Sequence, residues 1–149
     1  MPELGPGVDL FMEDLRGIDL RGVDLTECHL VNCNLTGADL RETTLARSIL
    51  RQCDLSGANF DGVEATSLKL DRAKLAGATF RGARLRLVFL DLADLKGADF
   101  TNAQLDQVSS MMGNWTDVIL QGASFSRSAL TKCTGLNLEG CSLESTTLD

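Results

Sequence analysis

A five-residue repeat runs through most of this chain and restricts its fold more than any other feature. From residue 10 to residue 130, every fifth residue is Leu or Phe at 22 of 25 positions, and Ala65, Ser110 and Trp115 are the exceptions. An α-helix cannot use this spacing, because five steps of about 100° each would spread the apolar residues around all of its sides. The repeat therefore predicts extended backbone.

Each repeat reads as one short strand followed by a turn. A second, mostly small residue, such as Ala38 or Cys53, comes two positions before each Leu or Phe. Residues two apart in a strand point to the same side, so both are expected to point inward. The two positions after each Leu or Phe are rich in Gly, Ser, Asn and Asp, which favour turns. A unit this short cannot bury its own apolar side, so it must stack on its neighbours.

A longer period of twenty residues indicates how the units stack. The phrase "LTGADL" at 35–40 returns as "LSGANF" at 55–60, "LAGATF" at 75–80 and "LKGADF" at 95–100. If four units close one coil, residues twenty apart lie above one another at the strand spacing of about 4.8 Å. The predicted fold is an all-β, four-sided parallel β-helix, a β-solenoid of about seven coils. Its core stack is predicted to be Leu20, Leu40, Phe60, Phe80, Phe100 and Leu120.

Two stretches depart from the regular pattern. In the first, Trp115 and Phe100 are large but Ser110 and Gly113 are small, so the coil either packs normally or loops out at "SSMMGNW", residues 109–115. In the second, a register slip is expected near 131–135, after which Leu residues resume the five-residue spacing. The predicted organisation is a lead-in at 1–7 and a single β-helix at 8–149. Unpaired backbone groups at the final coil would favour an end-to-end homodimer.

Composition gives little support for catalysis. The chain has no Tyr, one Trp and one His, and His29 is expected to point outward without a partner acid or nucleophile. We therefore predict no enzyme activity, no cofactor and no metal site. Five cysteines, an odd number without a CxxC pair, and the absence of a signal-like or long apolar segment predict a cytoplasmic protein with free thiols and no membrane partner.

The repeats closely resemble those of the pentapeptide-repeat family. "GADLR" at 37–41, "GANFD" at 57–61 and "GADFT" at 97–101 match its A(D/N)(L/F)XX consensus, and the resemblance covers about 8–130 and resumes at 136–148. It implies a right-handed, four-sided parallel β-helix. Some members are DNA mimics that bind type II topoisomerases and reduce quinolone susceptibility. This chain lacks the projecting loops and the terminal helical element that such members typically carry.

Two outer surfaces are candidates for binding. The first is an apolar patch at positions where most repeats are polar, and it consists of Leu87, Phe89, Leu92, Met111 and Met112. The second is the acidic amino-terminal part, since residues 1–64 hold 12 acids and five bases in a chain of net charge −7. The candidate DNA-mimic acids there are Asp14, Asp19, Asp24 and Asp39. The acidic total argues against direct nucleic-acid binding.

The sequence therefore predicts a non-enzymatic β-helical rod that binds another protein, or a second copy of itself, through its outer surface. The alternative is a DNA-mimicking modulator of DNA gyrase or topoisomerase IV that uses the acidic coils.

Overall fold

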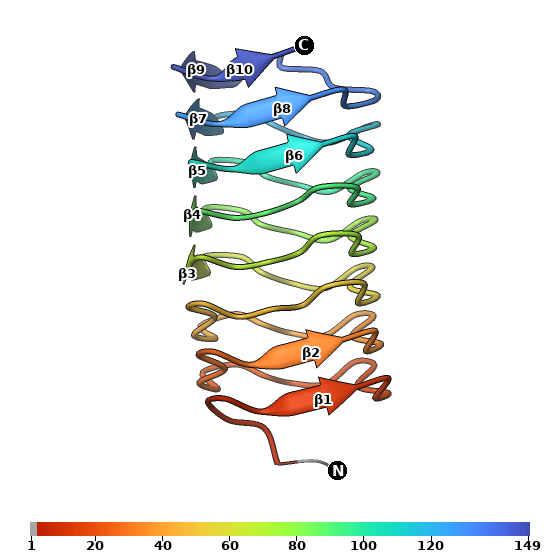
Figure 1. Ribbon diagram of the computed structural model, residues 1–149. Helices are drawn as coiled ribbons and strands as arrows, with labels where there is room; N and C mark the ends of the chain where they lie inside the picture. Colours follow the sequence, from red (N-terminus) through yellow and green to blue (C-terminus); the bar gives the residue numbers. More distant parts are fainter. Residues whose placement is uncertain (1–2) are drawn as a thin grey trace.

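The computed structural model describes residues 3–149 as one rod of stacked coils, with residue 3 and residue 149 at opposite ends of the rod (Figure 1). Residues 1–2 of the predicted lead-in lie outside the described residues. The strands are short: β1 Asp9–Phe11, β2 His29–Val31, β3 Glu64–Thr66, β4 Arg84–Arg86, β5 Gln104–Asp106, β6 Ser109–Met111, β7 Ser124–Ser126, β8 Ala129–Thr131, β9 Ser142–Glu144 and β10 Thr147–Leu148. Every strand pairing is parallel, which confirms the predicted parallel β-solenoid.

Two of the four sides carry the named strands. One side holds the two-stranded sheet β1-β2 and, nearer the carboxyl terminus, a three-stranded sheet in the order β10-β8-β6 (Figure 1). The adjacent side holds a five-stranded sheet in the order β3-β4-β5-β7-β9. Leu85 pairs with Leu105 twenty residues later, as the repeat predicts. The other two sides pair through single residues, such as Asp14 with Asn34 and Asp19 with Asp39. The sides of each coil therefore satisfy their backbone hydrogen bonds through the neighbouring coils, while the turns add bonds within the coil, such as that from Ala38 N to the carbonyl of Leu35 at 3.0 Å.

The corners are made by the second residue after each Leu or Phe, in the left-handed conformation. Gly37, with φ of 68°, adopts this conformation without a steric penalty because it has no Cβ. Leu92 occupies the same kind of corner with φ of 59°, where a Cβ is crowded. The turn geometry is thus fixed by the coil even where the residue does not favour it.

The interior is a continuous column of apolar side chains. All six residues of the predicted core stack are buried. Phe80 lies between Phe60 and Phe100 with ring centroids 4.6 Å away on both sides and nearly parallel planes. Identical rings at the coil spacing fill the same space in successive coils, which gives the dense packing expected of a protein core.

The irregular coil at 109–115 is packed, not looped out. Trp115 is fully buried, 5.8 Å from Phe100 by ring centroids, and its Nε1 donates a 3.0 Å hydrogen bond to Ser110 Oγ. A Cβ at Gly113 would meet Ser110 Oγ at 2.5 Å and Trp115 Nε1 at 2.9 Å. The small residues at 110 and 113 therefore make the space that the indole fills.

The last coil is shorter than the others. Ser109 pairs with Ala129 twenty residues later, but Ala129 pairs with Thr147 after only eighteen. Thr134 still keeps the twenty-residue register with Asn114, whereas Ser124 pairs with Ser142 after eighteen residues. The register changes between Thr134 and Ser142, through the loss of two residues from the coil.

Candidate partner-binding surfaces

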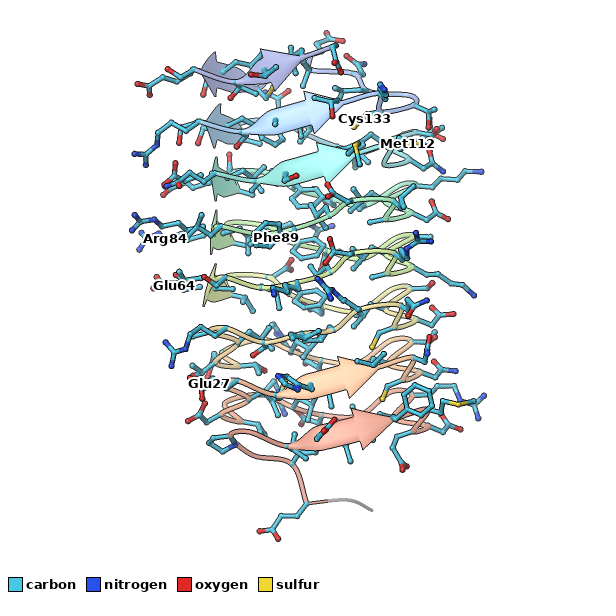
Figure 2. The ribbon with its side chains drawn as sticks, in the orientation of Figure 1. Glu27, Glu64, Arg84, Phe89, Met112 and Cys133 are labelled. Atoms are coloured by element: carbon cyan, nitrogen blue, oxygen red, sulfur yellow. The ribbon has the colours of Figure 1, made fainter. Side chains whose placement is uncertain are left out.

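The apolar patch lies on the side of β6 and on the two corners that bound this side. Phe89 pairs with Ser109 of β6, so it lies one coil before β6 on the same side. Leu92 N donates to the carbonyl of Met111 at 2.9 Å, which places these two residues in adjacent coils at one corner. Figure 2 shows Phe89 on the side that carries β6, with Met112 at its corner.

The five patch residues differ in exposure. Leu92, Met111 and Met112 are 39%, 45% and 55% exposed, whereas Phe89 and Leu87 are half-buried. Leu87 lies at the opposite corner of this side, with its backbone bonded to the carbonyl of Asp106. The structure thus brings Phe89, Leu92, Met111 and Met112 together and leaves Leu87 at the far edge.

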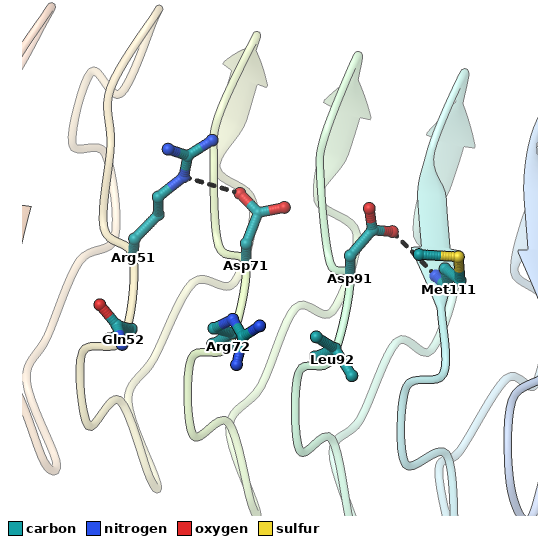
Figure 3. A pocket seen from close by; sticks show the side chains of 7 residues that line it. All are labelled: Arg51, Gln52, Asp71, Arg72, Asp91, Leu92 and Met111. Carbon is teal, nitrogen blue, oxygen red and sulfur yellow. Dashed lines mark hydrogen bonds and ion pairs between the residues drawn. The ribbon is translucent and has the colours of Figure 1, made fainter.

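A shallow hollow lies beside the exposed part of the patch (Figure 3). It is lined by Arg51, Gln52, Asp71, Arg72, Asp91, Leu92 and Met111. Arg51 Nε donates to Asp71 at 3.1 Å, and Asp91 accepts from the backbone N of Met111 at 2.8 Å. The hollow therefore has an apolar end, formed by Leu92 and Met111, next to charged groups.

The acids predicted to mimic DNA are largely neutralised by their own neighbours. Arg16 pairs with Asp14 at 2.7 Å, and Arg21 pairs with Asp19 at the same distance. The hydrogen bond from Arg21 lowers the pKa of Asp19 to about 2. Carboxylates held by arginines present little net negative charge to a partner, so the acid count overstates the negative potential of this region.

The remaining two candidate acids differ from each other. Arg41 donates to Asp39 at 2.6 Å and holds the pKa of that carboxyl below its ordinary value. Asp24 has no arginine beside it and instead accepts from the backbone N of Thr26 at 2.9 Å. Three of the four predicted acids are thus ion-paired, and only Asp24 is held by hydrogen bonds alone.

Sequence reasoning missed two features that the structure reveals. The phrase "DLR" at 14–16, 19–21 and 39–41 places Asp and Arg on either side of an inward Leu, so both point outward together. This spacing could have predicted the ion pairs. In addition, Phe11 and Met12 form an exposed apolar corner in the first coil, 61% and 70% exposed, and their deviation from the polar consensus could have revealed it.

The residues with potential chemistry divide between the surface and the core, where Cys33 and Cys53 lie close to each other. His29 is exposed on β2, and burial raises the pKa of Cys28 to about 11 and that of Cys53 to about 12, so both thiols stay protonated. All five cysteines are free. Within residues 3–149, no group of three or more His, Cys, Asp or Glu side chains could hold a metal ion. In the same range no helix has the length and apolar character needed to cross a bilayer.

Two models of the pentapeptide-repeat family match this chain, in agreement with the repeated coils of the structure. The family model "Pentapeptide repeat region" matches residues 14–80, and the model "Pentapeptide repeats (8 copies)" matches residues 73–109. No curated protein sequence matches the chain.

Two solved structures illustrate the likeness. A trypsin-treated form of QnrB1, a plasmid-mediated fluoroquinolone resistance protein, has a TM-score of 0.72 and 20% identity over 95% of this chain and 89% of its own. A pentapeptide repeat protein from the thylakoid lumen of Arabidopsis thaliana has 30% identity and a TM-score of 0.50 over 66% of this chain and 68% of its own.

Proposed function

This chain belongs to the pentapeptide-repeat family, and from that premise we propose that it is a non-enzymatic rod that binds another protein through the apolar patch. The observation that carries the proposal is the exposure of Leu92, Met111 and Met112 next to Phe89 on a rigid side. Equivalent positions in other coils are mostly polar or glycine. Clustered apolar side chains in water favour association, since burying them against a partner removes apolar surface from water.

Rigidity supports the same role. The patch residues belong to two adjacent coils whose backbones are hydrogen-bonded to the coils on both sides, and their inward neighbours are fully packed. A surface that is already ordered loses little conformational entropy on binding. The two methionines have flexible side chains that adapt to the shape of a partner.

The alternative, a DNA-mimicking modulator of type II topoisomerase, has less support. Duplex DNA carries about one charge per 1.7 Å, so a coil that rises about 4.8 Å would need about three unpaired negative charges. Residues 1–64 hold a net charge of −7 over about three coils, which is below that density, and Asp14, Asp19 and Asp39 are each held by an arginine. The shared rod shape remains its main support.

Two variants separate the hypotheses. Phe89→Asp with Met112→Asp changes the patch, whereas Asp14→Lys, Asp19→Lys, Asp24→Lys and Asp39→Lys change the acidic coils. Each variant and the wild-type protein are immobilised separately on beads and incubated with lysate of the source cell. The proteins that each retains are quantified by mass spectrometry.

A partner retained by the Lys variant but lost from the patch variant is the expected result. Loss only from the Lys variant would instead support the mimic. The mass of each variant in solution shows whether the retained partner is a second copy of the chain.

A further inference from the structure

Most cations of this protein are held in ion pairs, and most of the exceptions border the apolar patch. Ten of the 14 Lys and Arg side chains pair with a carboxylate. Among the described residues, the four cations without an ion pair are Lys69, Arg72, Lys96 and Lys132. Three of these four lie directly above or below a patch residue.

The twenty-residue register fixes their positions. Lys69 pairs with Phe89 in the same outward column, one coil toward the amino terminus. Arg72 occupies the corner beneath Leu92, and both line the hollow of Figure 3. Met112 N donates to the carbonyl of Thr131 at 2.8 Å, so Lys132 follows in the corner above Met112. The apolar patch is therefore bordered by positive charge on two edges.

The acids around the patch are engaged elsewhere. Asp71 pairs with Arg51 at 3.1 Å. Asp91 accepts from Ser109 Oγ at 3.0 Å as well as from the backbone of Met111, and Asp149 accepts from the backbone N of Lys132 at 3.0 Å. None of these carboxylates pairs with Lys69 or Arg72, so both cations remain available to a partner.

On the premise of the function proposed above, we infer that the partner presents an acidic, apolar segment of polypeptide to this surface. Its apolar side chains contact Phe89, Leu92 and Met112. Its carboxylates face Lys69, Arg72 and Lys132, which complement them in charge. Charge complementarity at the edge of an apolar contact selects among partners and fixes their orientation. In a chain of net charge −7, this border is a local exception that admits an acidic partner.

An anionic membrane would offer the same two chemistries, but the molecule disfavours it. A flat membrane would meet this side of the rod along its length, where the acids Asp9, Asp71 and Asp91 offset the cations and reduce the attraction to anionic lipid. A polypeptide segment covers only the patch and its cations. The free charges also lie on opposite edges of the patch, which suits a short chain laid along the rod.

A library of displayed random peptides tests the inference on the intact protein. Peptides are selected on the wild-type rod after depletion on the Phe89→Asp, Met112→Asp variant. An enriched peptide is then synthesised with its own sequence and with every Asp and Glu changed to Asn and Gln. Its affinity is measured for wild-type protein, for Lys69→Gln with Arg72→Gln, and for the control Lys74→Gln with Lys96→Gln. The control removes the same charge from the neighbouring side.

We expect enriched peptides that are acidic and apolar, weakened about tenfold by the amide version and by Lys69→Gln with Arg72→Gln, but not by the control. Patch-dependent peptides that are neutral or basic would overturn the inference and leave the proposed function standing. If the selection enriches no peptide whose binding depends on the patch, the result would count against the inference and against the proposed function. A different result would assign the surface to membranes and overturn the inference. In that case no peptide is enriched, and the wild-type protein binds phosphatidylserine vesicles but the Phe89→Asp, Met112→Asp variant does not.

Discussion

The amino-terminal coils and the coils around the patch are built on one core but present opposite surfaces. In the first coils, glycines such as Gly17 and Gly37 make the corners, and aspartates hold arginines two residues away. Around the patch, Leu92 and Met112 occupy the same left-handed corners, and within residues 3–149 neither Lys69 nor Arg72 forms an ion pair. Three of the four candidate acids in the amino-terminal coils are held by arginines, whereas the patch leaves apolar and positive groups exposed to solvent. Formal charge therefore identifies a binding surface less well than the pairing of each charge.

The largest effect should come from the core that both regions share. Phe80→Ala removes a ring stacked between two others, and deletions of this size destabilise proteins by about 3–5 kcal/mol. Denaturant unfolding followed by circular dichroism measures the loss. A single transition at lower denaturant concentration would show that the two regions unfold together. Two separate transitions would show that they unfold independently and do not share one cooperative core.

A smaller effect should separate stability from binding at the corners. Met112→Gly relieves a left-handed Met, with φ of 57°, and should raise stability by about 0.5 kcal/mol. Glu42→Gly, with φ of 61°, is the matched control in the acidic region. We expect both variants to gain stability in thermal unfolding and only Met112→Gly to weaken partner binding. Equal effects on binding would remove the distinction between the two regions.

The ion pairs of Asp14, Asp19 and Asp39 predict a modest change in binding when their arginines are removed. Replacing Arg16, Arg21 and Arg41 by Gln exposes three carboxylates, so affinity for oligolysine should rise by about two- to fivefold at low salt. Titration calorimetry with wild-type and variant protein measures the difference. An unchanged affinity would mean that the arginines do not mask the acids.

The smallest effect concerns pH. The pKa of Asp19, lowered to about 2, lies below its unfolded value, and the pKa of Asp14 and Asp39 is also lowered, in each case chiefly by the neighbouring arginine. Ion pairs of this kind stabilise the fold above the unfolded pKa and are lost as pH falls through the folded one. The Tm advantage of wild type over the triple Gln variant should be small at pH 5 and should disappear between about pH 4 and pH 2. A difference that persists at pH 2 would contradict the assignment.

Much of the fold could be predicted because each repeat carries the same information. Leu20 and Phe80 follow one spacing rule, so the coil, its register and its core stack follow from the period alone. The packing of residues 109–115 could not be predicted from the period, because side-chain volume alone does not reveal that Trp115 Nε1 donates a hydrogen bond to Ser110 Oγ. The shortened last coil depends on which hydrogen bonds Gly140 makes, and a gap in the spacing does not specify them.

The candidate surfaces were predictable only in part. Apolar residues at outward positions identify the patch, as Phe89 and Met112 illustrate. The state of each charge depends on contacts across and between coils, such as Arg47 with Glu27 at 2.7 Å, and counting acids by segment ignores them. Phe11 and Met12 depart from the polar consensus in the same way as the patch residues, so the same rule predicts their exposure.

Site-specific crosslinking in the source cell tests most directly whether the patch coils, not the acidic coils, meet the partner. A photoreactive phenylalanine analogue at Ser109, beside Phe89, is compared with one at Asp19 on the acidic coils. If the patch binds the partner, a discrete adduct forms from position 109, is lost with Met112→Asp, and is absent from position 19. An adduct from position 19 alone, or from position 109 regardless of Met112→Asp, would contradict binding through the patch.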